Sequence, residues 1–389
     1  MNPHHPWLIL LLAGALVGTP VAASAYPNVA PNACAWHTVV SSNPMPNANA
    51  LNAVTAISAK DAWAGGYYRD ASNNDQPLFE HWNGTKWSIV PSPNPGYSFI
   101  YGMTAISSND VWAVGSVYDS VHGAYQNLTM HWDGSAWTSI GVPSLGYVNN
   151  FLYGVSGTSV SDVWVVGTYA KSSSVRGTVI GHWNNSGGWV LGQGPVKGSA
   201  DNALVSVAAI SPKNAWAAGA YNSGSHFQTL AEHWTGTKWA VVSTPDVNAN
   251  DNPLNAIAAV SAKDVWGLGD FYTGSVFNTL AEHWNGTSWS IVPSPNAGSA
   301  STALFGAAAI KSTDVWAVGD YTKSGFARTY TMNWNGAAWA TVSSPNVGPY
   351  DSFLSAVAKI PGTTDVWAVG GTSNADHSNH LTLIEKFHC

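Results

Sequence analysis

The sequence predicts an all-β chain that folds as a seven-bladed β-propeller with four strands in each blade. Three observations predict it: a composition suited to short strands, a motif that recurs seven times, and chain ends that each supply part of one blade. Of the 389 residues only 9% are charged, while 38 are Gly and 21 are Trp. Such a composition favours strands joined by turns over long helices.

A hexapeptide of the type Asp-Val-Trp-Ala-Val-Gly recurs at intervals of 49 to 52 residues. Its seven copies begin at Asp61, Asp110, Asp162, Asn214, Asp264, Asp314 and Asp365. A unit of this length accommodates four strands and their turns, which is the size of a propeller blade. The repeat therefore predicts seven blades.

Each unit divides into four predicted strands. The first is rich in small residues, as in 51–58, and the second is the hexapeptide. The third ends in His-Trp, as in 81–82, and an Asn-Gly pair at 83–84 leads into a fourth strand at 87–90. Asn-Gly between two β-prone runs is a strong hairpin signal, because both residues tolerate positive φ.

The chain ends complete one blade between them. Residues 35–41 match a fourth strand that no first three strands precede, and 383–387 match a third strand that no fourth follows. We therefore expect the N-terminal strand to pair with the C-terminal blade and close the ring, which removes two exposed sheet edges.

The two cysteines support this closure. By alignment, Cys34 and Cys389 both fall on the turn between third and fourth strands, where the chain is interrupted. We expect a Cys34–Cys389 disulfide to replace that turn. The chain-entropy model gives so long a loop a stabilisation of roughly 4–5 kcal/mol, less any strain. Such a bond also suits an oxidising compartment.

The N-terminus has the features of an export signal. An apolar stretch from Trp7 to Val17 is followed by Ala23-Ser24-Ala25, a cleavage site of the A-x-A type. We expect residues 1–25 to be a signal peptide, 26–389 to be the propeller, and the protein to be secreted. A retained anchor is the alternative, but the apolar stretch is shorter than the ~20 residues that a span needs.

Charge narrows the choice of partner. The formal net charge is −7, and the 14 Lys and Arg residues form no cluster. Nucleic acids and anionic membranes bind through positive surface charge, so we expect neither as a partner. We expect a monomer whose ligand is a glycan, a peptide or a protein.

The blades resemble those of kelch and galactose-oxidase-type propellers, and of secreted bacterial repeat proteins with Asp-Val-Trp-Ala-Val-Gly blades. The resemblance rests on the Gly that ends each hexapeptide, doubled at Gly65-Gly66 and Gly370-Gly371, and on the spaced Trp residues. It implies a propeller over the whole mature chain. It implies no catalytic residue, because the copper site of galactose oxidase uses a Cys and both cysteines here are assigned to ring closure.

Most chemically distinctive side chains repeat with the blades. Every Trp except Trp7 falls at one of three repeat positions, and the four Glu share a single position. The Asp that begins the hexapeptide and the His before the third-strand Trp repeat as well. These residues are expected to build the scaffold by packing and hydrogen bonding, and not to stack on sugars.

Candidate ligand-binding residues precede the first strands, where long variable loops should surround the mouth of the channel. They are Asn149, Asn150, Asp201, Asn202, Asp251, Asn252, Asp351 and Ser352. Such a ring could coordinate Ca²⁺ or hydrogen-bond a glycan or peptide. The alternative is that these side chains only set the turn into each strand. No cofactor beyond this Ca²⁺ is predicted, and Asp376, His377 and His380 are read as an ordinary polar loop.

Three functions remain. The favoured one is an extracellular binding module that presents loops around the channel mouth, without catalytic residues. The second is a polysaccharide hydrolase or lyase, which would need two or more of Asp201, Asp251 and Asp351 to converge. The third is a structural cell-surface protein without a defined site.

Overall fold

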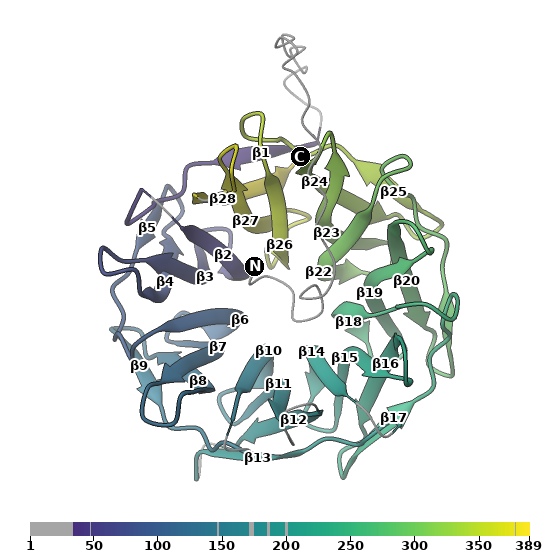
Figure 1. The fold of residues 1–389 in the computed structure, drawn as a ribbon, viewed down its shortest axis with the longest axis horizontal. Coiled ribbons are helices and arrows are strands. Elements are labelled where there is room, and N and C mark those ends of the chain that lie inside the picture. Colours follow the sequence, from purple (N-terminus) through teal and green to yellow (C-terminus); the bar gives the residue numbers. More distant parts are fainter. Residues whose placement is uncertain are drawn as a thin grey trace.

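A computed structural model of the chain describes residues 34–46, 48–145, 148–170, 175–184, 187–198, 201–377 and 379–389. These residues form seven four-stranded antiparallel sheets arranged as a ring around a central channel (Figure 1). The predicted seven-bladed propeller is confirmed. The predicted signal peptide, residues 1–25, lies outside the described residues. Among the residues described, no helix is both long and apolar enough to cross a membrane.

The described residues form twenty-eight strands. We number the blades by their first strands, so that blade 1 contains β2–β5 and blade 7 contains β26–β28 together with β1. The strands are β1 (Ala35–Val39), β2 (Asn49–Ser58), β3 (Asp61–Arg69), β4 (Asp75–Trp82), β5 (Trp87–Ile89), β6 (Ser98–Ser107), β7 (Asp110–Asp119), β8 (Ala124–Trp132), β9 (Trp137–Ile140), β10 (Asn150–Ser159), β11 (Asp162–Ala170), β12 (Arg176–Trp183), β13 (Trp189–Gln193), β14 (Asn202–Ser211), β15 (Asn214–Asn222), β16 (Phe227–Trp234), β17 (Trp239–Val242), β18 (Leu254–Ser261), β19 (Asp264–Tyr272), β20 (Phe277–Trp284), β21 (Trp289–Ile291), β22 (Thr302–Lys311), β23 (Asp314–Lys323), β24 (Phe326–Trp334), β25 (Trp339–Val342), β26 (Ser352–Lys359), β27 (Val366–Ser373) and β28 (His380–His388).

The last blade is assembled from both ends of the chain. β1 pairs antiparallel with β28, in a register that runs from Ala35 opposite His388 to Val39 opposite Ile384. Next to this pair, Cys34 and Cys389 form a disulfide. Ring closure and the disulfide, both expected from the sequence, are therefore confirmed.

Each first strand contains a β-bulge near its middle, and the bulge explains the Gly that ends every hexapeptide. In blade 4 the pairing of β14 with β15 shifts between Leu204 and Ser206. A Cβ on Gly219 would lie 2.0 Å from the carbonyl oxygen of Ala203, which no side chain tolerates. The same near-contact recurs in every blade, so the repeat requires Gly there to let the two inner strands approach.

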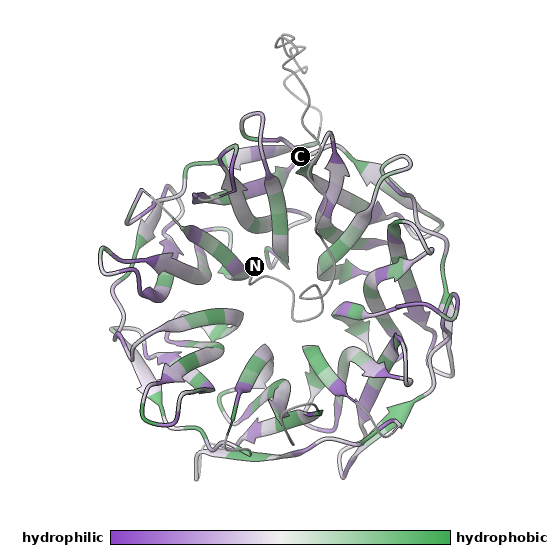
Figure 2. Ribbon diagram, viewed as in Figure 1, coloured by the Kyte–Doolittle hydropathy of each residue, from purple (hydrophilic) through white to green (hydrophobic). Residues whose placement is uncertain are grey.

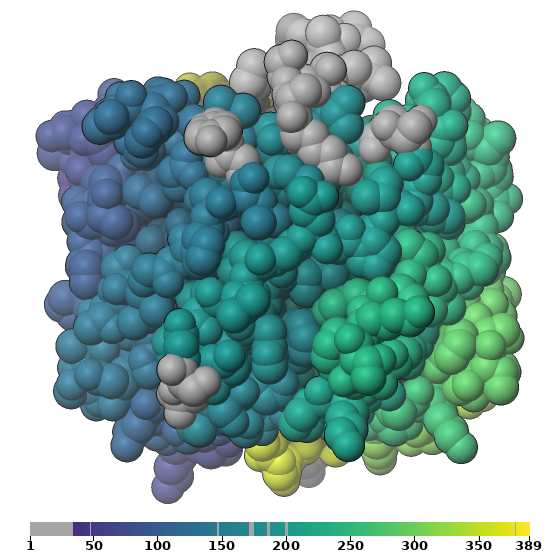
Figure 3. All heavy atoms as spheres, turned by 90° about the horizontal axis from the view of Figure 1, so that it is seen from below, coloured from purple at the N-terminus to yellow at the C-terminus, as the bar shows by residue number. Residues whose placement is uncertain are grey.

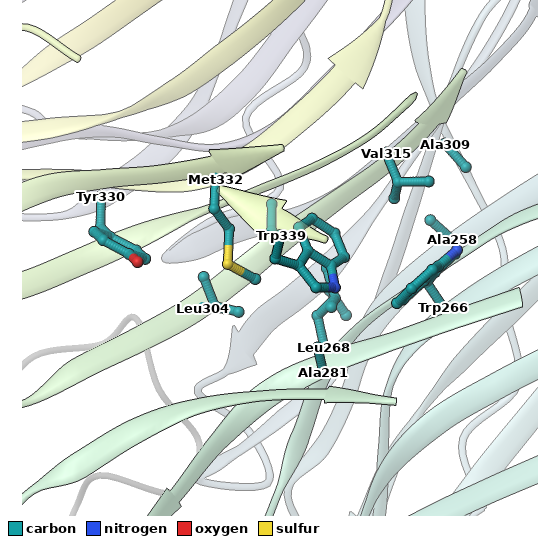
Figure 4. Packing of buried hydrophobic residues seen from close by; sticks show 12 residues of the cluster. Ala258, Trp266, Leu268, Ala281, Leu304, Ala309, Val315, Tyr330, Met332 and Trp339 are labelled. Atoms are coloured by element: carbon teal, nitrogen blue, oxygen red, sulfur yellow. The ribbon is translucent and has the colours of Figure 1, made fainter. Parts of the chain in front are cut away.

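The hydrophobic core lies between blades. At the boundary of blades 5 and 6, Trp266 meets Trp339 edge to face with ring centroids 5.1 Å apart (Figure 4). Apolar segments of the inner strands face neighbouring blades, whereas the connecting loops are mostly hydrophilic (Figure 2). Edge-to-face pairs add to the burial term, so these Trp residues hold the ring together.

The acids and histidines of the repeat bond to each other as expected of a scaffold. The carboxylate of Asp61 lies 2.8 Å from Nε2 of His81, and Asp110 pairs with His131 at the same distance. The His ring also packs on the hexapeptide Trp, with 4.4 Å between the Trp63 and His81 centroids. The pair thus links the second and third strands of its blade and supports the buried indole.

Candidate functional site at the channel mouth

The central channel is lined by the seven first strands, and at its bulges each blade contributes one side chain. The enclosed volume is about 230 Å³. The residues at the bulge positions are Asn52, Tyr101, Tyr153, Val205, Asn255, Phe305 and Ser355. Because these seven differ in chemistry, the channel is asymmetric although its backbone is repetitive.

Two acids lie beside the channel in adjacent blades. Asp270 and Asp320 each follow the hexapeptide Gly, on β19 and β23. Asp270 is buried and accepts a hydrogen bond of 2.7 Å from Nδ2 of Asn255, one of the channel residues. Asp320 is half-buried. The carboxylate of Asp270 is therefore removed from bulk water, and that of Asp320 is partly so.

Burial raises the pKa of Asp270 to about 7, and the nearby carboxylates of Asp320 and Asp251 add to the rise. The hydrogen bond from Asn255 opposes it. Burial also raises the pKa of Asp320 to about 7, with a further contribution from Asp351. The charged groups that shift these two pKa values are acids, and each of the outer two has a histidine beside it: His226 lies 3.6 Å from Asp251, and His377 pairs with Asp351.

The channel wall over blades 2 and 3 is aromatic. Phe99 stacks on Tyr101, and Phe151 stacks on Tyr153, with interplanar angles of 9° and 5°. The two pairs meet where the Tyr101 and Tyr153 rings lie 5.4 Å apart. Burial raises the pKa of Tyr153 to about 12, so its phenol is neutral at physiological pH. Tyr97 and Tyr125 extend the aromatic surface outward.

Four of the eight predicted mouth residues are fully buried. Three of them stabilise the loop that leads into the first strand: the Lys197 amide donates to Asn202 at 2.9 Å, the Val247 amide to Asn252 at 3.1 Å and the Val347 amide to Ser352 at 3.1 Å. Asn150 instead donates to Gln126 on β8 at 3.2 Å. The four are Asn150, Asn202, Asn252 and Ser352. Three of the four thus have the turn-setting role that the sequence left open as the alternative.

The other four, Asn149, Asp201, Asp251 and Asp351, lie one residue earlier and join neighbouring blades. In blade 5, Asp251 accepts the Phe227 amide of blade 4 at 2.8 Å, while its own carbonyl accepts the Tyr272 amide at 2.8 Å. Asp201 likewise accepts the Arg176 amide at 2.6 Å. These residues are partly or fully exposed. In Asp351 both carboxylate oxygens are used, one by the Ala327 amide and the other by the Ser373 hydroxyl and His377.

The structure brings two of these acids together with the channel pair. Asp251 interacts with Asp270, and Asp351 with Asp320, whereas no such interaction connects Asp201 to the pair. The sequence did not single out Asp270 or Asp320. The available signal was their shared repeat position after the hexapeptide Gly, where the other blades have Tyr, Ser, Thr, Ala or Gly.

A metal centre is not evident in the part of the chain that the structure describes, which contains no group of three or more His, Cys, Asp or Glu side chains placed to hold an ion. In the loop before β28, Nδ1 of His377 pairs with Asp351. Nε2 of His380 lies 3.0 Å from the His377 carbonyl oxygen. His377 thus links the loop to Asp351, which precedes β26, and His380 contacts the backbone of the loop.

Two of the three arginines are engaged in the scaffold. Arg69 forms an ion pair of 2.9 Å with the buried Asp75. The guanidinium of Arg328 donates to the carbonyl oxygens of Gly348, Pro349 and Tyr350. Both guanidinium groups are thus used within the scaffold, and that of Arg328 is held by the carbonyl groups just before Asp351.

The mouth therefore has an aromatic half over blades 2 and 3 and an acidic half over blades 5 to 7. Buried carboxylates bind cations by charge-assisted hydrogen bonds, and aromatic faces attract cations through their quadrupole. This chemistry suits a ligand that carries a positive charge.

No protein-family model and no curated protein sequence matches the chain. Among solved structures, it is similar to Ycf48 bound to a D1 peptide, with a TM-score of 0.54 and 11% identity over 91% of this chain and 97% of that one. It is also similar to an ulvan lyase of polysaccharide lyase family 25 bound to -[GlcA(1-4)Rha3S]-, with a TM-score of 0.53 and 10% identity over 84% of this chain and 89% of that one. At such identities the likeness shows the fold alone, and the resemblance to kelch propellers stays an expectation.

Proposed function

We propose that this protein is a secreted binding propeller that captures a peptide or protein segment at its channel mouth by a positively charged side chain. The observation that carries the proposal is the Asp270–Asp320 pair, two carboxylates whose pKa values are raised by burial and by further acids, Asp251 and Asp351. A Lys or Arg side chain entering the mouth would supply a positive charge. It would also lower the free energy of both carboxylates in their ionised form.

The aromatic half supports the same ligand class. The rings of Tyr101 and Tyr153, which line the channel, offer a surface to a cation or to the aliphatic stem of Lys or Arg. Ycf48, a propeller of similar fold, was solved with a bound peptide. A rigid ring with variable loops needs no catalytic group to bind a partner.

The composition of the mouth disfavours an acidic polysaccharide. The ulvan lyase was solved with a ligand that contains GlcA, a uronic acid. Such a ligand would bring negative charge toward Asp251, Asp270, Asp320 and Asp351, and like charges repel strongly where solvent is excluded. We therefore favour a binding function over the lyase alternative.

Secretion is part of the proposal. The Cys34–Cys389 disulfide supports an oxidising destination, since such bonds are rare in reducing compartments. The apolar N-terminal stretch with its Ala23-Ser24-Ala25 site supports export.

Calorimetric titration with a short Lys- and Arg-containing peptide, and with its fully acetylated, citrulline-substituted counterpart, tests the proposal. We expect only the cationic peptide to bind, with affinity that falls as salt rises. The double variant Asp270→Asn, Asp320→Asn should weaken binding at least tenfold, because it removes both charges without changing shape. Asp201→Asn is the matched control, since Asp201 lies at the mouth but does not interact with the pair.

The pH dependence of binding gives a second test of the same site. The pKa of both carboxylates is about 7, so the pair loses protons between pH 6 and pH 8 and cation affinity should rise over this range. The double variant should show no such rise. Equal binding of the cationic and neutral peptides, or an unchanged affinity in the double variant, would refute the proposed site.

A further inference from the structure

A box of four rings recurs at five of the seven described blade boundaries, and at the other two Asn333 or Lys386 replaces the His. One blade supplies its hexapeptide Trp and its third-strand His, and the next blade supplies its third- and fourth-strand Trp. Between blades 2 and 3, the ring of Trp112 lies 4.4 Å from His131, 4.9 Å from Trp183 and 5.3 Å from Trp189. In the last blade, Lys386 and Phe387 stand at the third-strand His and Trp positions.

In six of the seven described boundaries a β-branched side chain covers this box from the outer strand. It stands three residues after the fourth-strand Trp of the first blade and packs against the buried cluster. The six side chains are Val39, Val90, Ile140, Val242, Val292 and Val342.

The boundary between blades 3 and 4 differs, because Gly192 occupies the covering position. The box itself is complete: the ring of Trp164 lies 4.1 Å from His182, 4.9 Å from Trp234 and 5.2 Å from Trp239. A Cβ built on Gly192 would meet no atom within 4 Å. The missing side chain thus leaves open space where the other boundaries are filled.

The opening forms a cavity of about 370 Å³ whose walls include Trp164, Trp234 and Trp239. It lies on the outer part of blades 3 and 4, the teal blades that face the viewer in Figure 3. Trp239 is half-buried, whereas the six other fourth-strand Trp residues are buried. One indole of the scaffold is therefore available to a ligand.

We propose that this cavity binds a neutral pyranose ring of a glycan. The C–H groups on the face of a pyranose carry partial positive charge and pack on the negative face of an indole. Its hydroxyl groups need polar partners, and the amides of Asn184 and Gln193 line the same cavity together with the ring of His182.

The charge and size of the cavity agree with such an occupant. None of the side chains that line it is a carboxylate, an ammonium or a guanidinium group, so an uncharged ligand fits best. Its volume lies at the lower end of the range for small-molecule sites. The site is independent of the channel mouth, since its walls come from β11, β12, β13, β16 and β17 and the loop after β12.

Saturation-transfer difference NMR with the methyl glycosides of glucose, galactose and mannose tests the proposal, with indole as the apolar probe. We expect at least one glycoside to receive saturation, strongest at the C–H protons of one ring face. Gly192→Val restores the covering side chain of the other boundaries and should reduce the signal at least tenfold. Gly192→Ala should reduce it less.

Val242→Gly is the matched gain-of-site variant. It removes the covering side chain at the boundary of blades 4 and 5 and should create a second sugar signal there. The Asp270→Asn, Asp320→Asn protein should retain the original signal, which separates this site from the proposed peptide site. Binding of indole without any glycoside would identify the pocket as one for an apolar side chain and overturn the proposal. A glycoside signal that persists in Gly192→Val, or none in the wild type, would overturn it too.

Discussion

At the residue scale, the four glutamates show how one repeat position acquires different surroundings. All four are fully buried on third strands. Glu80 accepts bonds from the hydroxyl of Ser41 at 2.7 Å and the amide of Ser42 at 3.1 Å, and burial raises its pKa to about 7. Among the described atoms, Glu232 and Glu385 have no hydrogen-bond partner, and burial raises their pKa to about 8.

This difference predicts a pH-dependent stability. The folded-state pKa of Glu232 lies above the value near 4.5 of an exposed Glu, so the folded protein holds a proton that the unfolded chain releases. The stabilisation is therefore full below about pH 4.5 and is lost as pH rises toward 8. We expect the melting temperature to fall between pH 5 and pH 8.

The variant Glu232→Gln isolates the effect. Since glutamine keeps the shape and cannot ionise, we expect little change at pH 5 and a gain of up to about 4 kcal/mol in unfolding free energy at pH 8. Urea unfolding at the two pH values measures it. Glu80→Gln is the control and should gain less, because it gives up two bonds to the carboxylate. A Glu232→Gln protein less stable than wild type at pH 8 would contradict the assignment.

At the scale of the strand, the hexapeptide Gly and the β-bulge opposite it act together, because only Gly lets the two inner strands approach there. Gly219→Ala would drive a Cβ into the Ala203 carbonyl oxygen, so we expect a loss of about 2–4 kcal/mol in unfolding free energy. Chemical denaturation measures this loss. Gly192→Ala serves as the comparison, because its new Cβ enters open space and should leave stability unchanged or improved. Equal losses in both variants would show that the close approach is not the cause.

The strands were largely predictable, and the functional surface was not. Asn-Gly turns, Trp spacing and small first-strand residues identify the blades because each follows from local geometry. The hydrogen bond by which Asp251 joins two blades is donated by the Phe227 amide of the preceding blade, 24 residues away in sequence. The burial of Asp270 depends on its partner Asn255, whose position is fixed by the β-bulge of β18. No local sequence pattern shows where that bulge falls. The sequence shows Gly192 where the other six blades have Val or Ile, three residues after the fourth-strand Trp. Its meaning became clear only when the structure showed that this position covers the blade boundary.

At the scale of the whole molecule, closure joins segments 355 residues apart through the disulfide and the β1–β28 pairing. We expect the double variant Cys34→Ser, Cys389→Ser to fold but to lose up to about 4 kcal/mol of stability. Thermal unfolding with and without reductant measures the loss. Reductant should lower the melting temperature of the wild type and leave the double variant unchanged. A wild-type protein insensitive to complete reduction would show that β-pairing alone closes the ring.

The Cys34–Cys389 bond has a further consequence for a protein exposed to proteases. Because it ties together positions near the two extremes of the folded ring, one cut in any connecting loop leaves both pieces covalently attached. The seven sheets would still hold those pieces in place, so the nicked molecule would keep its shape. Only a second cut, or reduction of the bond, would allow a fragment to leave.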